Sequence, residues 1–276
     1  TPSSVVEDLF VSRPYTGRKQ FTPGIEGPAV DGEGRLYVVN YLKQGTIGVV
    51  DPNGKASEFL KLPRGSIANS IQISRAGEMF VADYKGHQIF KIDLRSKKLS
   101  AYVANVGMSQ PNDLVLASTG VLYASDPDWE KGTGRIWRIA PGGEAKVILQ
   151  GEVGTVNGLD LSPDEKTLYV GDSKSKKIWA FEIKGEGLAA RRLVTEFSDY
   201  EIDGIKVDSR GDLFVARIGK GTIAKISPTG AVLREIKLNG AEPTNLTFGG
   251  ADRRTIFVTQ RDGGFVESFR VDSSGR

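Results

Sequence analysis

The chain has 276 residues, 39% of them hydrophobic, and its 37 basic and 34 acidic residues leave a net charge of +3. This mixed charge does not predict a nucleic-acid-binding face. The sequence also contains no run of 18 apolar residues, so it predicts no membrane-spanning helix. The lack of cysteine excludes disulfides, thiolate metal sites and cysteine nucleophiles, and the single histidine, His87, excludes a multi-histidine metal site. Thr1 in place of Met fits a removed signal peptide or a trimmed chain, which leaves a cytoplasmic and a periplasmic or secreted location both open.

One pattern recurs six times along the chain. Each copy begins with a polar residue, continues as a short apolar strand, turns, and ends in a second strand that contains an aromatic residue. In chain order the copies are EGPAVDGEGRLYVVN from Glu26, NSIQISRAGEMFVAD from Asn69, NDLVLASTGVLYASD from Asn112, NGLDLSPDEKTLYVGD from Asn157, DGIKVDSRGDLFVAR from Asp203 and NLTFGGADRRTIFVTQ from Asn245. We call these six first residues the lead residues.

The spacing of the copies is regular. Successive lead residues are separated by 43, 43, 45, 46 and 42 positions. The aromatic residue follows its lead residue by 11 positions in four copies and by 12 in the two with longer turns, SPDEK and GGADRR. A turn that absorbs an extra residue keeps the two strands in register, so the copies predict six equivalent units. Their aromatic residues are Tyr37, Phe80, Tyr123, Tyr169, Phe214 and Phe257.

Each copy is followed by a further strand pair with a glycine-bearing turn, as in GTIGVVDPNGKASEFLKL, GRIWRIAPGGEAKVILQ and GTIAKISPTGAVLREIKL. Four strands in about 40 to 45 residues make one propeller blade. The sequence therefore predicts an all-β, six-bladed propeller of four-stranded antiparallel blades, forming a single domain over residues 1–276. The last repeat lacks a full fourth strand, and we expect the N-terminal segment SSVVEDLFVS, residues 3–12, to supply it and close the ring.

The lead residues are the candidate functional site. The first strand of each blade runs along the propeller axis, so the six lead side chains should converge at the mouth of the central channel. All six carry oxygen donors, and such groups are costly to bury without partners. A hard divalent cation such as Ca²⁺ would satisfy them, whereas the absence of sulfur and imidazole donors disfavours zinc and copper.

The alternative is that these residues only cap turns, which is a common role of Asn and Asp before strands. Glu26 and Asp203 depart from the asparagine pattern, and Glu is a poor turn former, which favours a metal site built on Glu26, Asn157 and Asp203. For Asn69 and Asn245 we expect a structural or supporting role.

Several stretches carry a resemblance to a known family. They are PGIEGPAVDGEGRLYVVN, QPNDLVLASTGVLYASDP, VNGLDLSPDEKTLYVGDS and AEPTNLTFGGADRRTIFVT, together with the fifth repeat and GKGTIAKISPTGAVLREIKL after it. They resemble the family that includes gluconolactonases, regucalcin and luciferin-regenerating enzyme, and more distantly diisopropyl fluorophosphatase and the paraoxonases. The resemblance covers essentially the whole chain, and it implies an enzyme that hydrolyses a sugar lactone to its aldonic acid.

The resemblance also implies a ligand set. In that family a Glu before the first blade, Asn residues before the third and fourth, and an Asp before the fifth hold a catalytic divalent ion. The matching residues here are Glu26, Asn157 and Asp203, and Asn112 corresponds to a residue that ligates the metal or meets substrate through a water. We expect one Ca²⁺ ion, with Mg²⁺, Mn²⁺ or Zn²⁺ as alternatives.

Two family features are missing. Some members carry a substrate-contacting arginine just before their Asn-Asp pair, and Gln110 stands nearest to that place in this chain. The histidine dyad of the paraoxonases is also absent, because the lone His87 lies in the stretch DYKGHQIF. We expect His87 to be a surface or turn residue of the second blade.

The chemistry of lactone hydrolysis gives roles to these residues. A cation bound to the lactone carbonyl oxygen would polarise it and stabilise the tetrahedral oxyanion, while an activated water attacks the carbonyl carbon. Asp203 or Asp113, the acid that the resemblance places near the substrate, would take the proton from that water. An Asp bound to a cation has a lowered pKa and is a weaker base, which favours Asp113 if it is not itself a ligand.

Residues that follow the second strands are candidates for substrate contact. Besides Asn112 and Asp113, we expect Tyr84, Trp129 and Arg217 in this role. Trp129 lies in the polar loop SDPDWEKGTG, where its ring could stack on a sugar.

Tyr41 and Asp126 occupy similar positions and are further candidates of the same kind.

We expect the partner to be a small lactone, with no binding to nucleic acid or to a membrane, and we expect the protein to be a monomer or a weak dimer. Two other functions stay open: hydrolysis of organophosphates or aryl esters at the same metal, and a non-enzymatic binding propeller.

Overall fold

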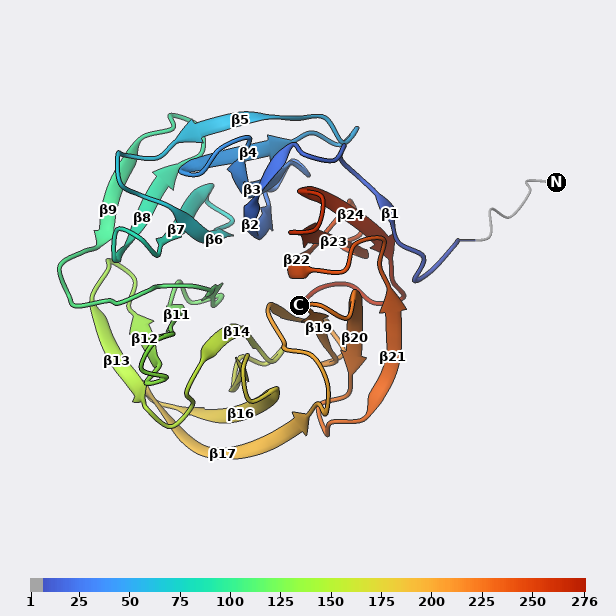
Figure 1. Ribbon diagram of the computed structural model, residues 1–276. Helices are drawn as coiled ribbons and strands as arrows, with labels where there is room; N and C mark the ends of the chain where they lie inside the picture. Colours follow the sequence, from blue (N-terminus) through green and yellow to red (C-terminus); the bar gives the residue numbers. More distant parts are fainter. Residues whose placement is uncertain (1–6) are drawn as a thin grey trace.

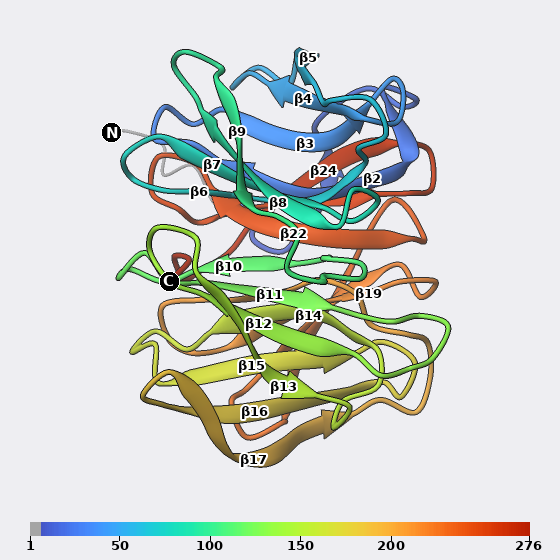
Figure 2. The same ribbon diagram turned by 90° about the vertical axis from the view of Figure 1, so that its left-hand side faces the viewer.

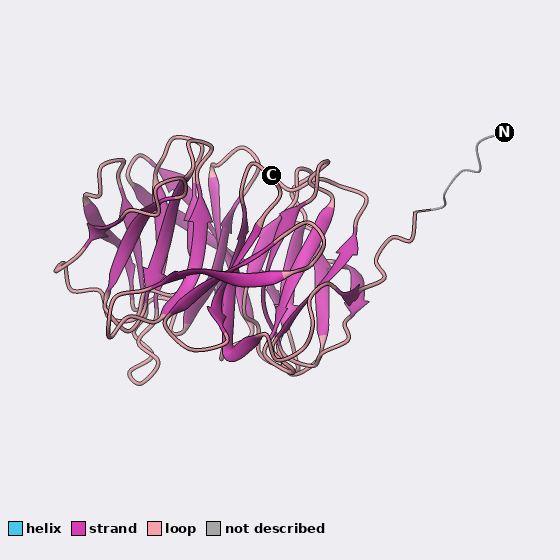
Figure 3. Ribbon diagram, turned by 90° about the horizontal axis from the view of Figure 1, so that it is seen from above, coloured by secondary structure: helices cyan, strands magenta, loops and turns pink. Residues whose placement is uncertain are grey.

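The structure is a computed structural model that describes residues 7–276, and in this range it contains strands and no helix (Figure 3). Six four-stranded antiparallel sheets stand around a central axis like the blades of a propeller (Figure 1). The predicted fold class and blade number are therefore confirmed. No helix within residues 7–276 is long and apolar enough to cross a bilayer.

Each blade runs from an inner strand at the axis to an outer strand at the rim, in chain order. In blades 1 to 3 the strands are β2 (Phe21–Val30), β3 (Leu36–Tyr41), β4 (Thr46–Val50) and β5 (Ala56–Lys61); β6 (Ala68–Ile73), β7 (Glu78–Asp83), β8 (Gln88–Asp93) and β9 (Leu99–Val103); and β10 (Leu114–Leu116), β11 (Leu122–Asp126), β12 (Arg135–Ile139) and β13 (Ala145–Gln150).

Blades 4 to 6 follow the same order, except that the outer strand of the last blade comes from the start of the chain. Their strands are β14 (Val156–Leu161), β15 (Thr167–Asp172), β16 (Lys177–Lys184) and β17 (Gly187–Glu196); β18 (Ile205–Val207), β19 (Leu213–Arg217), β20 (Thr222–Ile226) and β21 (Val232–Lys237); and β22 (Pro243–Gly249), β23 (Thr255–Gln260), β24 (Phe265–Arg270) and β1 (Arg13–Pro14). The six predicted aromatic residues all lie on the second strand of their blade.

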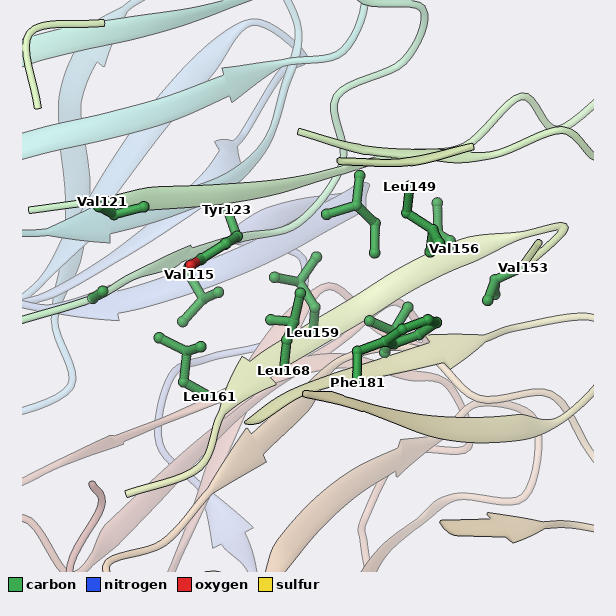
Figure 4. Packing of buried hydrophobic residues seen from close by; sticks show 13 residues of the cluster. Val115, Val121, Tyr123, Leu149, Val153, Val156, Leu159, Leu161, Leu168 and Phe181 are labelled. Atoms are coloured by element: carbon green, nitrogen blue, oxygen red, sulfur yellow. The ribbon is translucent and has the colours of Figure 1, made fainter. Parts of the chain in front are cut away.

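The hydrophobic core lies between neighbouring blades. Val115 and Tyr123 of blade 3 pack against Leu159, Leu168 and Phe181 of blade 4 (Figure 4). Fully burying one such side chain stabilises a protein by about 1.5–3 kcal/mol, so each blade depends on its neighbours for stability. Second strands face a blade on both sides and are buried throughout, as β11 and β19 show, whereas the outer strand β21 is mostly exposed.

The N-terminal part of the chain closes the ring, as predicted, but the strand lies further along than predicted. Arg13–Pro14 pairs antiparallel with β24, and Leu9 forms a single parallel bridge with Arg270. Among its described residues, the predicted segment 3–12 forms no strand and makes only that one β-bridge, and residues 3–6 lie outside the described range. Proline is tolerated in β1 because an edge strand does not need every backbone N–H.

A buried carboxylate, Glu267 of β24, ties this closing segment to the loop before blade 6. Its side chain accepts hydrogen bonds from the Ser12 hydroxyl at 2.6 Å, from the Asn239 backbone N–H at 2.9 Å and from the Gly240 N–H at 3.2 Å. Glu267 is fully shielded from solvent. One carboxylate thus joins the first and last parts of the ring.

The lead residues lie at irregular places in the inner strands. In blades 1, 2, 4 and 6 the pairing of the inner strand with the second strand shifts register around the lead residue. In blades 3 and 5 the inner strand begins only after the lead residue. A bulge re-aims a side chain, so the irregular pairing in these four blades frees the lead residue from the regular alternation of the strand.

Close packing at the axis requires glycine after some lead residues. A Cβ on Gly158 would lie 2.3 Å from the Asp203 carbonyl oxygen and 2.9 Å from the Ile205 nitrogen. A Cβ on Gly204 would lie 2.8 Å from the Cα of Asn245. The inner strands of blades 4, 5 and 6 therefore approach each other closely only because these positions have no side chain.

The end of the channel opposite the lead residues is covered by residues 272–276. Ser273 donates to the Asp208 carboxylate at 2.5 Å, and Arg276 donates Nε to Asp160 at 2.9 Å. Figures 1 and 2 show the C-terminal end at the ring centre, on one face. Asp160 lies near the end of β14, three residues beyond the lead residue Asn157.

We expect Glu267→Ala to destabilise the fold by about 2–5 kcal/mol, because it leaves buried N–H and hydroxyl donors without an acceptor. The measurement is the free energy of unfolding in urea. Glu58→Ala on the exposed face of β5 is the control and should leave the unfolding midpoint unchanged. Equal effects of the two substitutions would contradict the closing role of Glu267.

Gly158→Ala should cost about 1–3 kcal/mol, because the new methyl group overlaps backbone atoms of the neighbouring inner strand. Gly32→Ala is the matched control, since a Cβ there meets no atom within 4 Å. Denaturant unfolding of both variants checks the difference. A Gly158→Ala protein as stable as Gly32→Ala would show that the inner strands can separate freely.

Candidate active site

A pocket of about 340 Å³ lies at the end of the channel where the lead residues gather. Five of the six lead residues line it, and the exception is Asn245. The other lining residues are Tyr84, Gln110, Trp129, Ser173, Glu201, Ile202, Ile218 and Arg261. This size suits a small molecule, and the lead residues of blades 1 to 5 meet at one place.

Glu26 is buried in β2 and fixed through one of its two oxygens. Oε2 accepts a hydrogen bond from the Gly27 N–H and another from Asn245 Nδ2 at 3.1 Å. The Asn245 carbonyl oxygen is itself occupied by the Leu246 N–H at 2.9 Å. Asn245 therefore supports Glu26 from behind the pocket, in line with the expected supporting role.

Asp203 is buried beside Glu26, and its Oδ1 has no hydrogen-bond partner among the described residues. Burial raises the pKa of Asp203 to about 7, with the Asp113 charge adding to the rise and the Arg261 charge opposing it. Burial and the charges of Asp203 and Asp113 likewise hold the pKa of Glu26 well above its usual range. The protein thus places two carboxylates together without enough positive charge to balance them.

The asparagines of the pocket differ in what their amides do. Asn157 donates Nδ2 to the Ser173 hydroxyl at 2.9 Å, and its carbonyl oxygen accepts no hydrogen bond from the described residues. The Asn112 carbonyl oxygen accepts a hydrogen bond from Asn69 Nδ2. Asn157 therefore offers a free oxygen donor, whereas the oxygen of Asn112 is shared with its neighbour.

Asp113 lies behind the pocket rather than in its lining. It is 2% exposed, its Oδ1 accepts the Leu114 N–H at 2.9 Å, and its Oδ2 has no partner among the described residues. Burial raises the pKa of Asp113, and the Lys206 charge opposes that rise. Its charge reaches both Glu26 and Asp203, but it does not face the space a substrate would fill.

This donor set fits a hard divalent cation. The buried, unpaired oxygen of Asp203, the neighbouring Glu26 carboxylate and the free carbonyl oxygen of Asn157 are the ligand types that Ca²⁺ takes. Within residues 7–276 no group of three or more Asp, Glu, His or Cys side chains is arranged to hold a metal. A cation here would therefore depend on asparagine oxygens and on water or substrate to complete its shell.

The structure divides the predicted substrate contacts. Tyr84 and Trp129 line the pocket, and the backbone N–H of Trp129 donates to the Gln110 side chain at 3.1 Å. Arg217 does not line it: the side chain is 1% exposed and pairs with Asp199 at 2.8 Å. Arg217 was expected to contact substrate because it ends β19. In the structure its side chain instead bonds to Asp199 and Tyr200 in the loop before Asp203.

Tyr41 and Asp126 also lie outside the pocket lining. Tyr41 packs edge-on against Phe21 at 5.6 Å between ring centres. Asp126 accepts hydrogen bonds from Trp137 and from the backbone of the loop before Asn112. His87 lies exposed in the turn between β7 and β8, as predicted, with Nδ1 on the Ser109 carbonyl oxygen at 2.5 Å.

Sequence reasoning missed Arg261 and Glu201, two charged residues of the pocket. Arg261 directly follows β23, and its guanidinium has no hydrogen bond or ion pair with the described residues. Glu201 stands two positions before the lead residue Asp203. A signal for Arg261 existed, because it is the first residue after the last copy of the repeat, where the chain turns at the pocket end.

Comparison with known proteins relates this chain to a family that includes sugar lactonases. A family profile described as "SMP-30/Gluconolactonase/LRE-like region" matches residues 25–261. A gluconolactonase of Zymomonas mobilis is 28% identical over 244 residues, which cover 75% of this chain and 68% of that protein. A 6-deoxy-6-sulfogluconolactonase of Pseudomonas putida is 34% identical over 116 residues, but these cover only 41% of this chain and 40% of the relative.

Among solved structures, a protein described as a calcium-binding regucalcin from Agrobacterium tumefaciens superposes with a TM-score of 0.82. The match covers 95% of this chain and 96% of that one at 20% identity, which supports the common fold. The profile match spans all six lead residues and most of the ring. The chain belongs to the SMP-30/gluconolactonase/LRE-like family.

Proposed function

We propose that the protein is a metal-dependent lactonase that hydrolyses a sugar lactone to its aldonic acid. The observation that carries the proposal is the pair of buried carboxylates, Glu26 and Asp203, with an unpaired oxygen facing a small polar pocket. Relatives that act on gluconolactone and sulfogluconolactone support the reaction class, and the calcium-binding relative supports the choice of cation.

Glu26, Asn157 and Asp203 would hold the cation. Asn112 would be a further ligand, and its carbonyl oxygen would then contact both the cation and the Asn69 amide. Ca²⁺ fits oxygen-only donors in a flexible shell, and Mg²⁺, Mn²⁺ and Zn²⁺ are the alternatives. A divalent ion at this place would polarise a lactone carbonyl and balance the negative charge that develops on its oxygen. Asn245 and Ser173 orient the ligands Glu26 and Asn157 through the hydrogen bonds described above.

The rest of the pocket suits a polyhydroxylated ring. Trp129 offers an aromatic face for the sugar carbons, and Gln110 holds the Trp129 backbone in place. Tyr84 and Asn69 bring polar groups to the same space from blade 2. Arg261 would donate to substrate hydroxyls or to the carbonyl oxygen as it gains charge, because no described protein group occupies its guanidinium.

Geometry favours Asp203 over Asp113 as the group that takes the proton from the attacking water. Asp203 lines the pocket, whereas Asp113 lies behind it. A general base must come within hydrogen-bond reach of the proton it takes, which Asp113 does not do from its buried place. Asp113 would act through its charge, which disfavours loss of the cation from Glu26 and Asp203.

Metal removal tests the proposal directly. We expect exhaustive chelation to reduce hydrolysis of glucono-1,5-lactone on the order of 100-fold or more, and added Ca²⁺ to restore it, because the cation supplies the main charge stabilisation. Chelation should also lower the melting temperature, since a ligand bound to the folded state stabilises it. Full activity after metal removal would overturn the proposal.

A comparison of substrates separates the alternatives. A phosphotriester or aryl ester turned over faster than any sugar lactone would assign the same metal to organophosphate or ester hydrolysis. A protein that binds a cation but hydrolyses none of these would be a binding propeller.

Glu26→Gln and Asp203→Asn should each weaken cation binding, because a carboxamide replaces a charged donor with a neutral one of the same shape. We expect a loss of affinity of about 100-fold or more in calorimetric titration and a parallel loss of activity, because losing a residue that only orients a ligand already costs about 10- to 100-fold. Glu58→Gln on the outer strand is the control and should change neither quantity. Titration curves of the two site variants that match the control would remove Glu26 and Asp203 from the ligand set.

A further inference from the structure

A polar, buried residue lies at the end of every second strand, three positions after the aromatic residue of its repeat. It is the last residue of the strand in blades 2 to 6 and the last but one in blade 1. These residues close the six copies of the repeat and occupy the same place in each blade, and none is more than 8% exposed. They are Asn40, Asp83, Asp126, Asp172, Arg217 and Gln260, in blade order. Burying a polar side chain without a partner is costly, so each should have a defined bonding role.

In the first four blades that role is the same. Each of these side chains bonds to the backbone of the residue two positions before its lead residue. The bonds are Asn40 Nδ2 to Gly24 O at 2.9 Å, Ile67 N to Asp83 Oδ1 at 3.1 Å, Gln110 N to Asp126 Oδ1 at 2.5 Å and Thr155 N to Asp172 Oδ1 at 3.3 Å. In these four blades the segment before the lead residue is therefore held by a side-chain hydrogen bond at the same position.

Blades 5 and 6 fasten the same segment at slightly earlier positions. Gln260 accepts the Glu242 N–H at 3.0 Å and donates to the Gly240 carbonyl at 3.0 Å. Arg217 donates Nη2 to the carbonyl oxygen of Asp199, to that of Tyr200 at 3.3 Å and to the Asp199 carboxylate at 2.8 Å. All six blades therefore use the end of the second strand as a clamp.

Arg217 is the one positively charged residue among the six clamp residues. The aspartates of blades 2 to 4 accept from backbone N–H groups, whereas Arg217 donates to backbone carbonyls. Its guanidinium also lies 3.8 Å from the centre of the Phe197 ring, a favourable cation–π position. A single planar cation can satisfy several oxygens at once, and neither lysine nor a neutral side chain reproduces that geometry.

The segment that Arg217 holds carries one wall of the pocket. Glu201, Ile202 and Asp203 line the pocket and directly follow the clamped residues Asp199 and Tyr200. On its other side Asp203 is held by the neighbour of Arg217 in the chain. The Asp203 N–H donates to the Ala216 carbonyl at 3.0 Å, and the Ala216 N–H donates to the Gly204 carbonyl at 2.9 Å.

From these contacts we propose that Arg217 is a positioning residue, which fixes Asp203 in place for the cation by clamping residues 199–200. The inference rests on the proposed metal site, because the clamp matters for function only if Asp203 is a ligand. It also gives the role of the other five clamp residues, which hold the remaining lead segments. Partners that orient metal ligands typically change metal affinity by about 10- to 100-fold when they are lost.

The test compares Arg217→Met with Arg270→Met. The first removes the guanidinium and keeps an unbranched apolar side chain, and the second removes an arginine of β24 that pairs with Asp252 and Glu7 away from the pocket. Two readouts are used: hydrogen–deuterium exchange of the peptide over residues 197–203 in metal-free protein, and Ca²⁺ affinity by calorimetry. Asp199→Asn, which keeps both backbone bonds, is a milder variant if Arg217→Met does not fold.

We expect Arg217→Met to speed exchange over residues 197–203 and to weaken Ca²⁺ binding about 10- to 100-fold, while Arg270→Met changes neither. Asp199→Asn should show the same changes to a smaller degree. Exchange and affinity in Arg217→Met that match Arg270→Met would overturn the clamp. Wild-type protein that binds no divalent cation would overturn the proposed function instead, and the exchange result would still decide whether Arg217 holds the loop.

Discussion

The central constraint of this structure is a concentration of negative charge where six inner strands meet. Glu26 and Asp203 are buried next to each other, and Asp113 adds a third carboxylate behind them. Burial and mutual repulsion both oppose the charged forms of these groups. Such an arrangement persists only if the surrounding ring is rigid, and the packing between blades and the clamps at the strand ends provide that rigidity.

The fold could be predicted because the sequence repeats it six times. Each copy has the same apolar strands, turn and aromatic position, so errors in any one copy are corrected by the others. The exact closing strand could not be predicted, because Arg13–Pro14 forms its strand through pairing with β24 and through Glu267, not through any pattern of its own. A two-residue strand of polar and imino residues has no signature that periodicity can detect.

The site was predictable only where it follows the repeat. The lead residues occur at a fixed place in each copy, and five of them line the pocket. Arg217 also occurs at a fixed place, but which way its side chain points depends on the loop above it, and this loop differs in length between blades. Glu201 lies in such a loop, where no periodic rule applies, and it was missed for that reason. Arg261 directly follows the last copy of the repeat, so its position could have been predicted, but not the direction of its side chain.

The covering of the far channel end by residues 272–276 has a consequence for turnover. With residues of that end bonded to Asp208 and Asp160, the proposed function has substrate enter and product leave on the side of the pocket. Opening a neutral lactone ring creates an acid that ionises at neutral pH, so under the proposed function the departing molecule would be an anion close to the carboxylates of Glu26, Asp203 and Glu201. Repulsion from Glu201 in the pocket would then favour its escape and oppose its return, giving the pocket a directional preference without any moving gate.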